Sequence, residues 1–182
     1  MLSNVATRRT APLSQAGRAT SAITYTYLET SIGPLLLTAS DSGLDSVLFP
    51  KNGHPSTPAP EWQKDASLLQ EPIRQLRAYF AGQLENFDLA LAPRGTPFQQ
   101  KVWDELCRIP YGETISYGEL AKRIGNPNAS RAVGLANGSN PIPIIIPCHR
   151  VIGSNGKLTG YGGGLPIKEK LLALERRQLR LL

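Results

Sequence analysis

Cysteine is scarce in this sequence: the 182 residues contain only Cys107 and Cys148, with no Cys-x-x-Cys pair. Two cysteines are too few for a disulfide-stapled fold, which argues for a reducing compartment. Histidine is equally rare, and His54 and His149 show no metal-ligand spacing with the cysteines. No apolar run approaches the roughly eighteen residues of a membrane-spanning helix. The sequence therefore predicts a soluble chain without a structural zinc site.

Acidic residues are absent from the first 22 residues, which carry Arg8, Arg9 and Arg18 together with many Ser, Thr and Ala. This composition is shared by disordered basic tails and by organellar transit peptides, and it lacks the continuous apolar stretch of a secretory signal. We expect residues 1–22 to be a flexible basic tail, with the transit peptide as the alternative.

Charge of opposite sign dominates the two halves that follow. Residues 23–95 hold five basic and eight acidic side chains, and residues 96–182 hold twelve basic and six acidic ones. The resulting net charges, −3 and +6, predict a polyanion contact confined to the C-terminal half. A solvated surface that happens to be basic explains the charge equally well.

Residues 23–93 are predicted to form an N-terminal α/β domain. Short β-like runs at residues 23–30, 34–40 and 44–50 are separated by turn signals, which predicts an antiparallel meander. Residues 51–62 form a Pro-rich loop. A helix begins near Pro72 and ends near Gly82, and residues 86–92 are expected to form a further strand. The inner face of this helix is predicted to carry Ile73, Leu76, Arg77 and Phe80.

Residues 94–182 are predicted to form a mainly helical domain. Thr96 caps a helix whose first residue is Pro97, and Cys107 is an inert thiol on the core face of that helix. Ser116 and Glu119 have capping-box spacing and open a short helix. A Gly-containing turn leads to a second short helix over residues 129–138. This pattern is typical of a helix-turn-helix, although any helical hairpin would look similar.

The second short helix is rich in small residues and carries one long side chain, Arg131, near its start. A helix this smooth could pack closely against another helix, or could lie in a minor groove while Arg131 reaches into the base stack. The small residues are Ser130, Ala132, Gly134 and Ala136.

The run of isoleucines at residues 142–146 predicts a buried strand, and it is followed by Cys148 and His149. A thiol reacts as the thiolate and needs a base or a cation nearby. Because adjacent residues do not face each other, a water is the expected relay between the two side chains. Without other evidence, a buried core thiol is the simpler interpretation.

Glu175 supplies the other evidence. It shares a helix face with Leu171 and Leu179, so it should point into the core, where a carboxylate needs a partner. His149 is the expected partner, which would complete a nucleophile, base and orienter set. The alternative is that Glu175 turns outward and pairs with Arg176 or Lys170.

From Thr96 to Glu175 the sequence resembles the O6-alkylguanine-DNA alkyltransferases, also called methylated-DNA–protein-cysteine methyltransferases. The resemblance is carried by "SYGELAKRIGNPNASRAVGLANGSNPIPIIIPCHRVIG", by "TGYGGG" and by "KEKLLALE". It is weaker from Ile23 to Pro93. The resemblance implies a ribonuclease-H-like N-terminal domain with an antiparallel sheet and a helix. It also implies a C-terminal winged helix-turn-helix domain that carries out the reaction.

Site roles follow from the resemblance position by position. Cys148 would be the acceptor thiolate, His149 its base acting through water and Glu175 the orienting carboxylate. Asn140 would hold the active-site segment, Tyr117 would donate to guanine N3 and help to turn the nucleotide out, and Arg131 would fill the vacated space. The other implied contacts are DNA-facing Ser130, Ala132 and Gly134, and pocket-lining Pro143, Val151, Tyr161 and Gly162.

The resemblance implies stoichiometric repair of O6-alkylguanine, with O4-alkylthymine as a second possible substrate, and it implies no cofactor and no metal. The expected partner is alkylated double-stranded DNA, bound by a monomer, with cooperative assembly on DNA left open. The expected location is the bacterial cytoplasm, or the nucleus of a eukaryote. Gly162 stands where some members have serine. The rival functions are lesion recognition without repair, thiol hydrolysis and transcription regulation.

Overall fold

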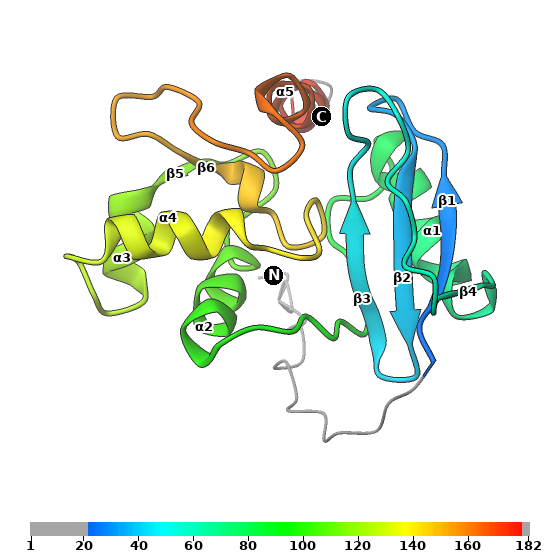
Figure 1. Ribbon diagram of the computed structural model, residues 1–182. Helices are drawn as coiled ribbons and strands as arrows, with labels where there is room; N and C mark the ends of the chain where they lie inside the picture. Colours follow the sequence, from blue (N-terminus) through cyan, green and yellow to red (C-terminus); the bar gives the residue numbers. More distant parts are fainter. Residues whose placement is uncertain (1–21, 180–182) are drawn as a thin grey trace, which may run out of the picture.

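The computed structural model describes residues 22–179, so the tail expected over residues 1–22 lies outside it except for Ala22. Figure 1 shows two halves side by side: a sheet with a helix behind it, and a group of helices. The sheet half is N-terminal and the helical half is C-terminal, as predicted. Within residues 22–179, none of the helices combines the length and apolarity needed to cross a bilayer.

The N-terminal sheet has the strand order β3-β2-β1-β4. The predicted antiparallel meander forms β1 (Thr24–Leu28), β2 (Leu35–Ser40) and β3 (Gly43–Leu48). The prediction missed the fourth strand, the two-residue β4 (Gln63–Lys64), which pairs in parallel with β1 after the Pro-rich loop. A strand this short shows no sequence periodicity, and its pairing depends on where the loop returns.

The helix behind the sheet is α1 (Gln70–Phe80), which follows the 3-10 turn η1 (Ser67–Leu69) and stops before Gly82, whose φ is +76°. Its buried face is rotated from the predicted one: Arg77 is exposed, whereas Gln75 and Tyr79 are buried. The Gln75 amide is satisfied there, because it accepts from Asp88 N and donates to Asp88 O, each at 2.9 Å.

The strand predicted over residues 86–92 does not form. Gln75 occupies the backbone groups of Asp88, and the segment makes one isolated parallel bridge, between Leu44 and Leu91. Gly43, which has φ +126°, permits this close approach, since a Cβ there would collide with the Ala90 carbonyl. The Gln75 side chain thus takes the place of the strand-to-strand hydrogen bonds that the sequence pattern of residues 86–92 suggested.

Two helices of the C-terminal half begin at their predicted caps. Thr96 and Gln99 form a capping box at α2 (Pro97–Leu106), and Ser116 Oγ accepts from Glu119 N at the start of α3 (Tyr117–Arg123). α4 (Ser130–Gly138) completes the helix-turn-helix, and Trp103 Nε1 donates to Ala136 O at 2.8 Å to join α2 to α4. The remaining elements are β5 (Ile115–Ser116), 3-10 turn η2 (Cys148–Arg150), β6 (Val151–Ile152) and α5 (Leu165–Leu179).

The isoleucine run is buried but is not a strand. Prolines at positions 141, 143 and 147 lack the N–H groups that a sheet ladder needs. The segment instead turns on itself, with Ile144 at φ +77° and Ile146 N donating to Ile142 O at 2.9 Å. This turn delivers Cys148 and His149 into η2, a 3-10 turn, where the prediction placed them at a strand end.

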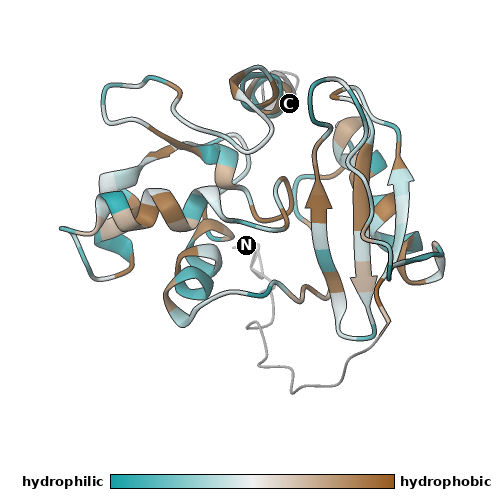
Figure 2. Ribbon diagram, in the orientation of Figure 1, coloured by the Kyte–Doolittle hydropathy of each residue, from teal (hydrophilic) through white to brown (hydrophobic). Residues whose placement is uncertain are grey.

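One hydrophobic core runs through both halves of residues 22–179. Figure 2 shows hydrophobic residues on the sheet and in the segment after α4, where the halves meet. Val47 N of β3 donates to Pro141 O at 2.9 Å across this junction. The turn that carries Cys148 is therefore built against the N-terminal sheet.

Candidate active site

Asn140 fixes the turn that carries Cys148. Its Nδ2 donates to Ile146 O at 2.8 Å, and its Oδ1 accepts from Ile142 N at 3.0 Å. Asn137, which sequence reasoning missed, donates from Nδ2 to Cys148 O at 3.4 Å. The Asn140 amide thus bridges the two ends of the turn, and the Asn137 amide binds the carbonyl of Cys148, the residue that follows the turn.

His149 and Glu175 form the predicted pair, with Nε2 and Oε1 2.7 Å apart and both side chains fully buried. The outward pairing of Glu175 with Arg176 or Lys170 is excluded by this burial. Since Nε2 faces a carboxylate, it is the nitrogen that carries the proton, which leaves Nδ1 as the basic atom. Nδ1 is buried and has no hydrogen-bond partner among residues 22–179.

Three further residues, which the sequence did not indicate, donate hydrogen bonds to Glu175. Arg150 reaches both carboxylate oxygens, with Nε and Nη2 each 3.0 Å away, and the Gly112 N–H donates at 3.0 Å. The Tyr79 hydroxyl, from α1, donates to Oε1 at 2.9 Å. The guanidinium of Arg150 also donates to Ile109 O and lies 5.5 Å from the centre of the Tyr111 ring. Arg150 is therefore a buried structural cation.

Burial favours the neutral forms of both Cys148 and His149. Burial raises the pKa of the Cys148 thiol to about 11, although Asn140 and Lys168 act in the opposite direction. Burial also lowers the pKa of His149, and Glu175 offsets only part of that effect. At neutral pH the thiol thus keeps its proton and the imidazole is free to accept one. A thiolate forms here only when the base removes that proton.

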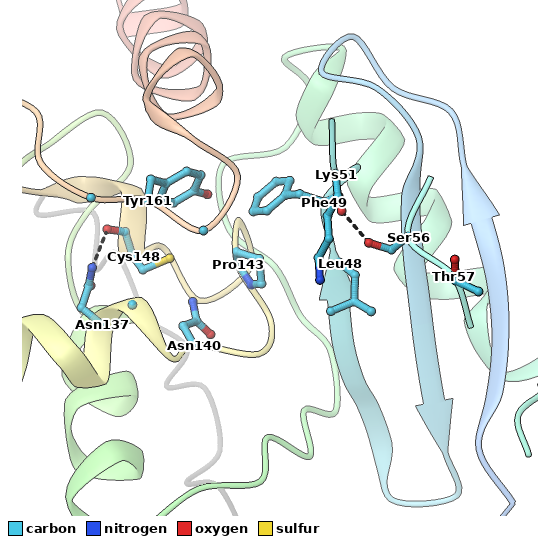
Figure 3. Close-up of a pocket in the computed structure, with 13 residues that line it drawn as sticks. Leu48, Phe49, Lys51, Ser56, Thr57, Asn137, Asn140, Pro143, Cys148 and Tyr161 are labelled. Carbon is cyan, nitrogen blue, oxygen red and sulfur yellow. Dashed lines mark hydrogen bonds between the residues drawn. The ribbon is translucent and has the colours of Figure 1, made fainter. Parts of the chain in front are cut away.

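A cavity of about 380 Å³ opens at Cys148 between the two halves. Figure 3 shows Cys148, Asn140 and Pro143 on one side of it, with Leu48 and Phe49 of the sheet half opposite. Of the predicted pocket residues, Pro143, Tyr161 and Gly162 line the cavity. The N-terminal wall, which the sequence did not reveal, consists of Leu48, Phe49, Lys51, Ser56 and Thr57.

Val151 is the exception among the predicted pocket residues. Its side chain is fully buried outside the cavity lining, and its carbonyl accepts from Lys168 Nζ at 2.6 Å. The same ammonium donates to Thr159 O at 3.0 Å. Lys168, another residue that sequence reasoning missed, thereby ties β6 to the glycine-rich loop (residues 156–164), which carries Tyr161.

The outer face of α4 lies away from the core. Arg131 and Ala132 are exposed there, and Ser130 and Gly134 are half-buried, but Ala136 is buried against α2. Leu135, which the sequence analysis passed over, is 74% exposed. The helix surface is therefore less smooth than predicted.

Tyr117 lies between α4 and the glycine-rich loop. A Cβ added at Gly134 would lie 3.8 Å from two carbons of the Tyr117 ring, and the Tyr117 hydroxyl accepts from Thr159 Oγ1 at 3.3 Å. Within residues 22–179, no cluster of His, Cys, Asp and Glu is arranged to hold a metal ion.

Two family profiles match the chain. One, described as "6-O-methylguanine DNA methyltransferase, ribonuclease-like domain", matches residues 23–93. The other, described as "6-O-methylguanine DNA methyltransferase, DNA binding domain", matches residues 97–177. Together they span both halves of the fold.

Known proteins of the same kind are similar over most of their length. The methylated-DNA–protein-cysteine methyltransferase of Methanosarcina acetivorans is 58% identical over 151 residues, covering 83% of this chain and 97% of the relative. That of Mycobacterium tuberculosis is 53% identical over 155 residues, covering 85% and 93%.

Solved structures agree. Mycobacterium tuberculosis OGT in complex with DNA has a TM-score of 0.79 and 52% identity, covering 85% of this chain and 94% of the other. The Mycobacterium tuberculosis O6-methylguanine methyltransferase has a TM-score of 0.78 and 50% identity, covering 87% and 98%. The chain belongs to the methylated-DNA–protein-cysteine methyltransferase family.

Proposed function

We propose that the protein repairs O6-alkylguanine in double-stranded DNA by moving the alkyl group onto its own Cys148, once per molecule. The observation that carries this proposal is a neutral thiol at the end of a cavity, next to a histidine held by a buried carboxylate. Family membership supplies the reaction type, and the site supplies the residues.

We assign the transfer step to the residues of this site as follows. His149 Nδ1, acting through a water, takes the proton of Cys148, and the thiolate attacks the alkyl carbon in line with its bond to O6. The S–C bond forms as the C–O bond breaks, and the electron pair of that bond goes to the guanine. Tyr117 donates a proton to guanine N3, and its phenolate is reprotonated through solvent from the imidazolium. The resulting thioether has no hydrolytic route back, which makes the protein single-turnover.

The lesion must leave the duplex before Cys148 can reach it, since the acceptor is only 4% exposed and lies inside a cavity. Extruding a nucleotide costs a few kcal/mol. We assign compensation of that cost to Arg131, which would occupy the vacated space from the minor groove, with Ser130, Ala132 and Gly134 alongside it. The net charge of +6 on residues 96–182 supports this face as the DNA contact, as does the relative solved with DNA.

Intact-protein mass spectrometry after incubation with duplex DNA that contains one O6-methylguanine tests the proposal. The expected result is a gain of one methylene mass, which peptide mapping places on Cys148. A parallel duplex with O4-methylthymine tests the second substrate. Binding without any mass gain would instead indicate a protein that recognises lesions without repairing them.

A further inference from the structure

A hydrogen bond from the N-terminal half reaches the reacting centre. Tyr79 lies on α1, and its hydroxyl donates to Glu175 Oε1 at 2.9 Å, with both side chains fully buried. This is the same oxygen that lies 2.7 Å from His149 Nε2. A residue of the ribonuclease-like half thus shares an acceptor atom with the residue that deprotonates Cys148 in the proposed function.

The ring of Tyr79 is packed among other aromatic rings, and its hydroxyl donates to Glu175. It packs on Phe87 with the ring centres 5.4 Å apart and edge-on to Tyr111 at 6.1 Å. A phenylalanine would fill this space equally well and would not require a polar group to be taken out of water. The hydroxyl therefore adds an interaction with Glu175 that the packing of the core does not need.

The charges around this oxygen come from several elements. Glu175 faces His149 and Arg150 from η2, Tyr79 from α1 and the Gly112 N–H from the loop after α2. The phenols of Tyr111 and Tyr161 also lie near Glu175. Around His149 the other charged or titratable groups are Arg150, Lys168 and the neighbouring Cys148. Glu175 is the one carboxylate facing His149 among these groups, so a change in its charge distribution acts directly on the imidazole.

We propose that Tyr79 is a positioning residue for alkyl transfer: its hydroxyl competes with the His149 imidazole for Glu175 Oε1 and so weakens the hold of His149 on the proton that it takes from Cys148. The inference rests on the proposed role of His149 as the base. A donor to a carboxylate oxygen disperses its negative charge, and a less negative carboxylate stabilises the imidazolium less.

Removal of the hydroxyl has a defined sign. In Tyr79→Phe, Glu175 keeps more negative charge for His149, so the pKa of His149 rises. Less of the imidazole is then neutral in mildly acidic solution. The acidic limb of the pH profile, where the transfer rate falls as His149 becomes protonated, therefore moves to higher pH. On the plateau above the limb, where the imidazole is neutral in both proteins, the stronger base transfers at least as fast. A loosened site would instead lower the plateau.

The test is single-turnover transfer from duplex O6-methylguanine by the full-length protein, followed between about pH 5 and 8. Tyr25→Phe, which removes a phenol hydroxyl from β1, is the matched control. In Tyr79→Phe we expect the midpoint of the acidic limb to move to higher pH by about half a pH unit to one unit. The plateau rate should be retained, and the profile of Tyr25→Phe should match that of the wild type. ¹⁵N NMR titration of the His149 ring should show the same shift.

A lower plateau with an unmoved limb would overturn the inference, and so would a profile identical to that of the wild type. If Tyr79→Phe does not fold, 3-fluorotyrosine at position 79 keeps the shape and donates more strongly. The limb should then move to lower pH, and an unmoved limb would again overturn the inference. Failure of the wild-type protein to transfer any alkyl group would refute the proposed function itself, which separates the two failures.

Discussion

Phe49 and Tyr161 pack across the junction of the two halves, with their ring centres 5.4 Å apart. Phe49 follows β3, and Tyr161 belongs to the glycine-rich loop that borders the cavity. The phenylalanine ring also covers Gly163, where an added Cβ would lie 2.9 Å from two ring carbons. The N-terminal half thus supports the glycine-rich loop through the contacts of Phe49 with Tyr161 and Gly163.

Gly163→Ala tests that support. The added methyl group collides with Phe49, so the loop and Tyr161 must shift, and we expect alkyl transfer to slow several-fold. Single-turnover rates on duplex O6-methylguanine provide the measurement. Combining the change with Phe49→Leu should restore part of the rate, because the smaller side chain vacates the contested space. An unaffected rate for Gly163→Ala alone would contradict the role given to Phe49.

Cys148→Ala should abolish transfer while the protein still binds alkylated duplex, because the substitution removes the nucleophile and leaves the helix-turn-helix intact. Cys107→Ala is the matched control. Burial raises the pKa of Cys107 to about 12, so its thiol stays protonated, and transfer should continue without it. Mass spectrometry and a binding assay distinguish the two variants. Methylated Cys148→Ala protein would show that another residue is the acceptor.

Arg131→Ala should impair repair of duplex DNA far more than reaction with free O6-benzylguanine, because a free base needs no extrusion. If Arg131 offsets a few kcal/mol of the extrusion cost, the rate on duplex should fall by about tenfold or more. Arg123→Ala removes the same charge from α3, where Arg123 Nε bonds Glu119. The control should reduce the salt dependence of binding without a comparable loss of rate. Equal losses of rate on both substrates would contradict the role of Arg131 in filling the space left by the extruded nucleotide.

Glu175 should make stability pH-dependent. Burial alone would raise its pKa, but its hydrogen bonds and ion pairs with His149 and Arg150 prevail and lower it from 4.5 to about 2. Between these values the unfolded chain binds more protons than the folded one, so the free energy of unfolding should fall as pH drops from 4.5 toward 2.

Denaturant unfolding across this acidic range measures the effect. Glu175→Gln should lose this part of the pH dependence. It should also be destabilised at neutral pH by about 3–5 kcal/mol, because Arg150 is left buried without its carboxylate. If the two proteins lose stability in parallel as pH falls, Glu175 is not the responsible group.

Local signals predicted the parts of the fold that depend on neighbouring residues. Thr96 and Ser116 cap their helices because the side chain and its N–H partner are three residues apart. Glu175 faces inward because its helix spacing matches that of Leu171. The same reasoning failed for the isoleucine run, where the prolines outweighed hydrophobicity, and for residues 86–92, where the side chain of Gln75 took the backbone groups of Asp88.

Contacts between distant segments left no local signal. Tyr79 meets Glu175 across 96 positions, and Arg150 meets Ile109 O across 41. The N-terminal wall of the cavity likewise exists only because the sheet docks on the turn before Cys148. Arg150 was visible next to His149, but its burial beneath the site could be learned only from the packed structure.

The charge difference between the halves has a consequence for the encounter with DNA. A sheet half of net charge −3 beside a helical half of +6 gives the molecule a permanent electric dipole. Near a polyanion, that dipole experiences a torque that rotates α3 and α4 toward the phosphates before any contact is made. A larger share of collisions would then begin with the basic C-terminal half turned toward the duplex.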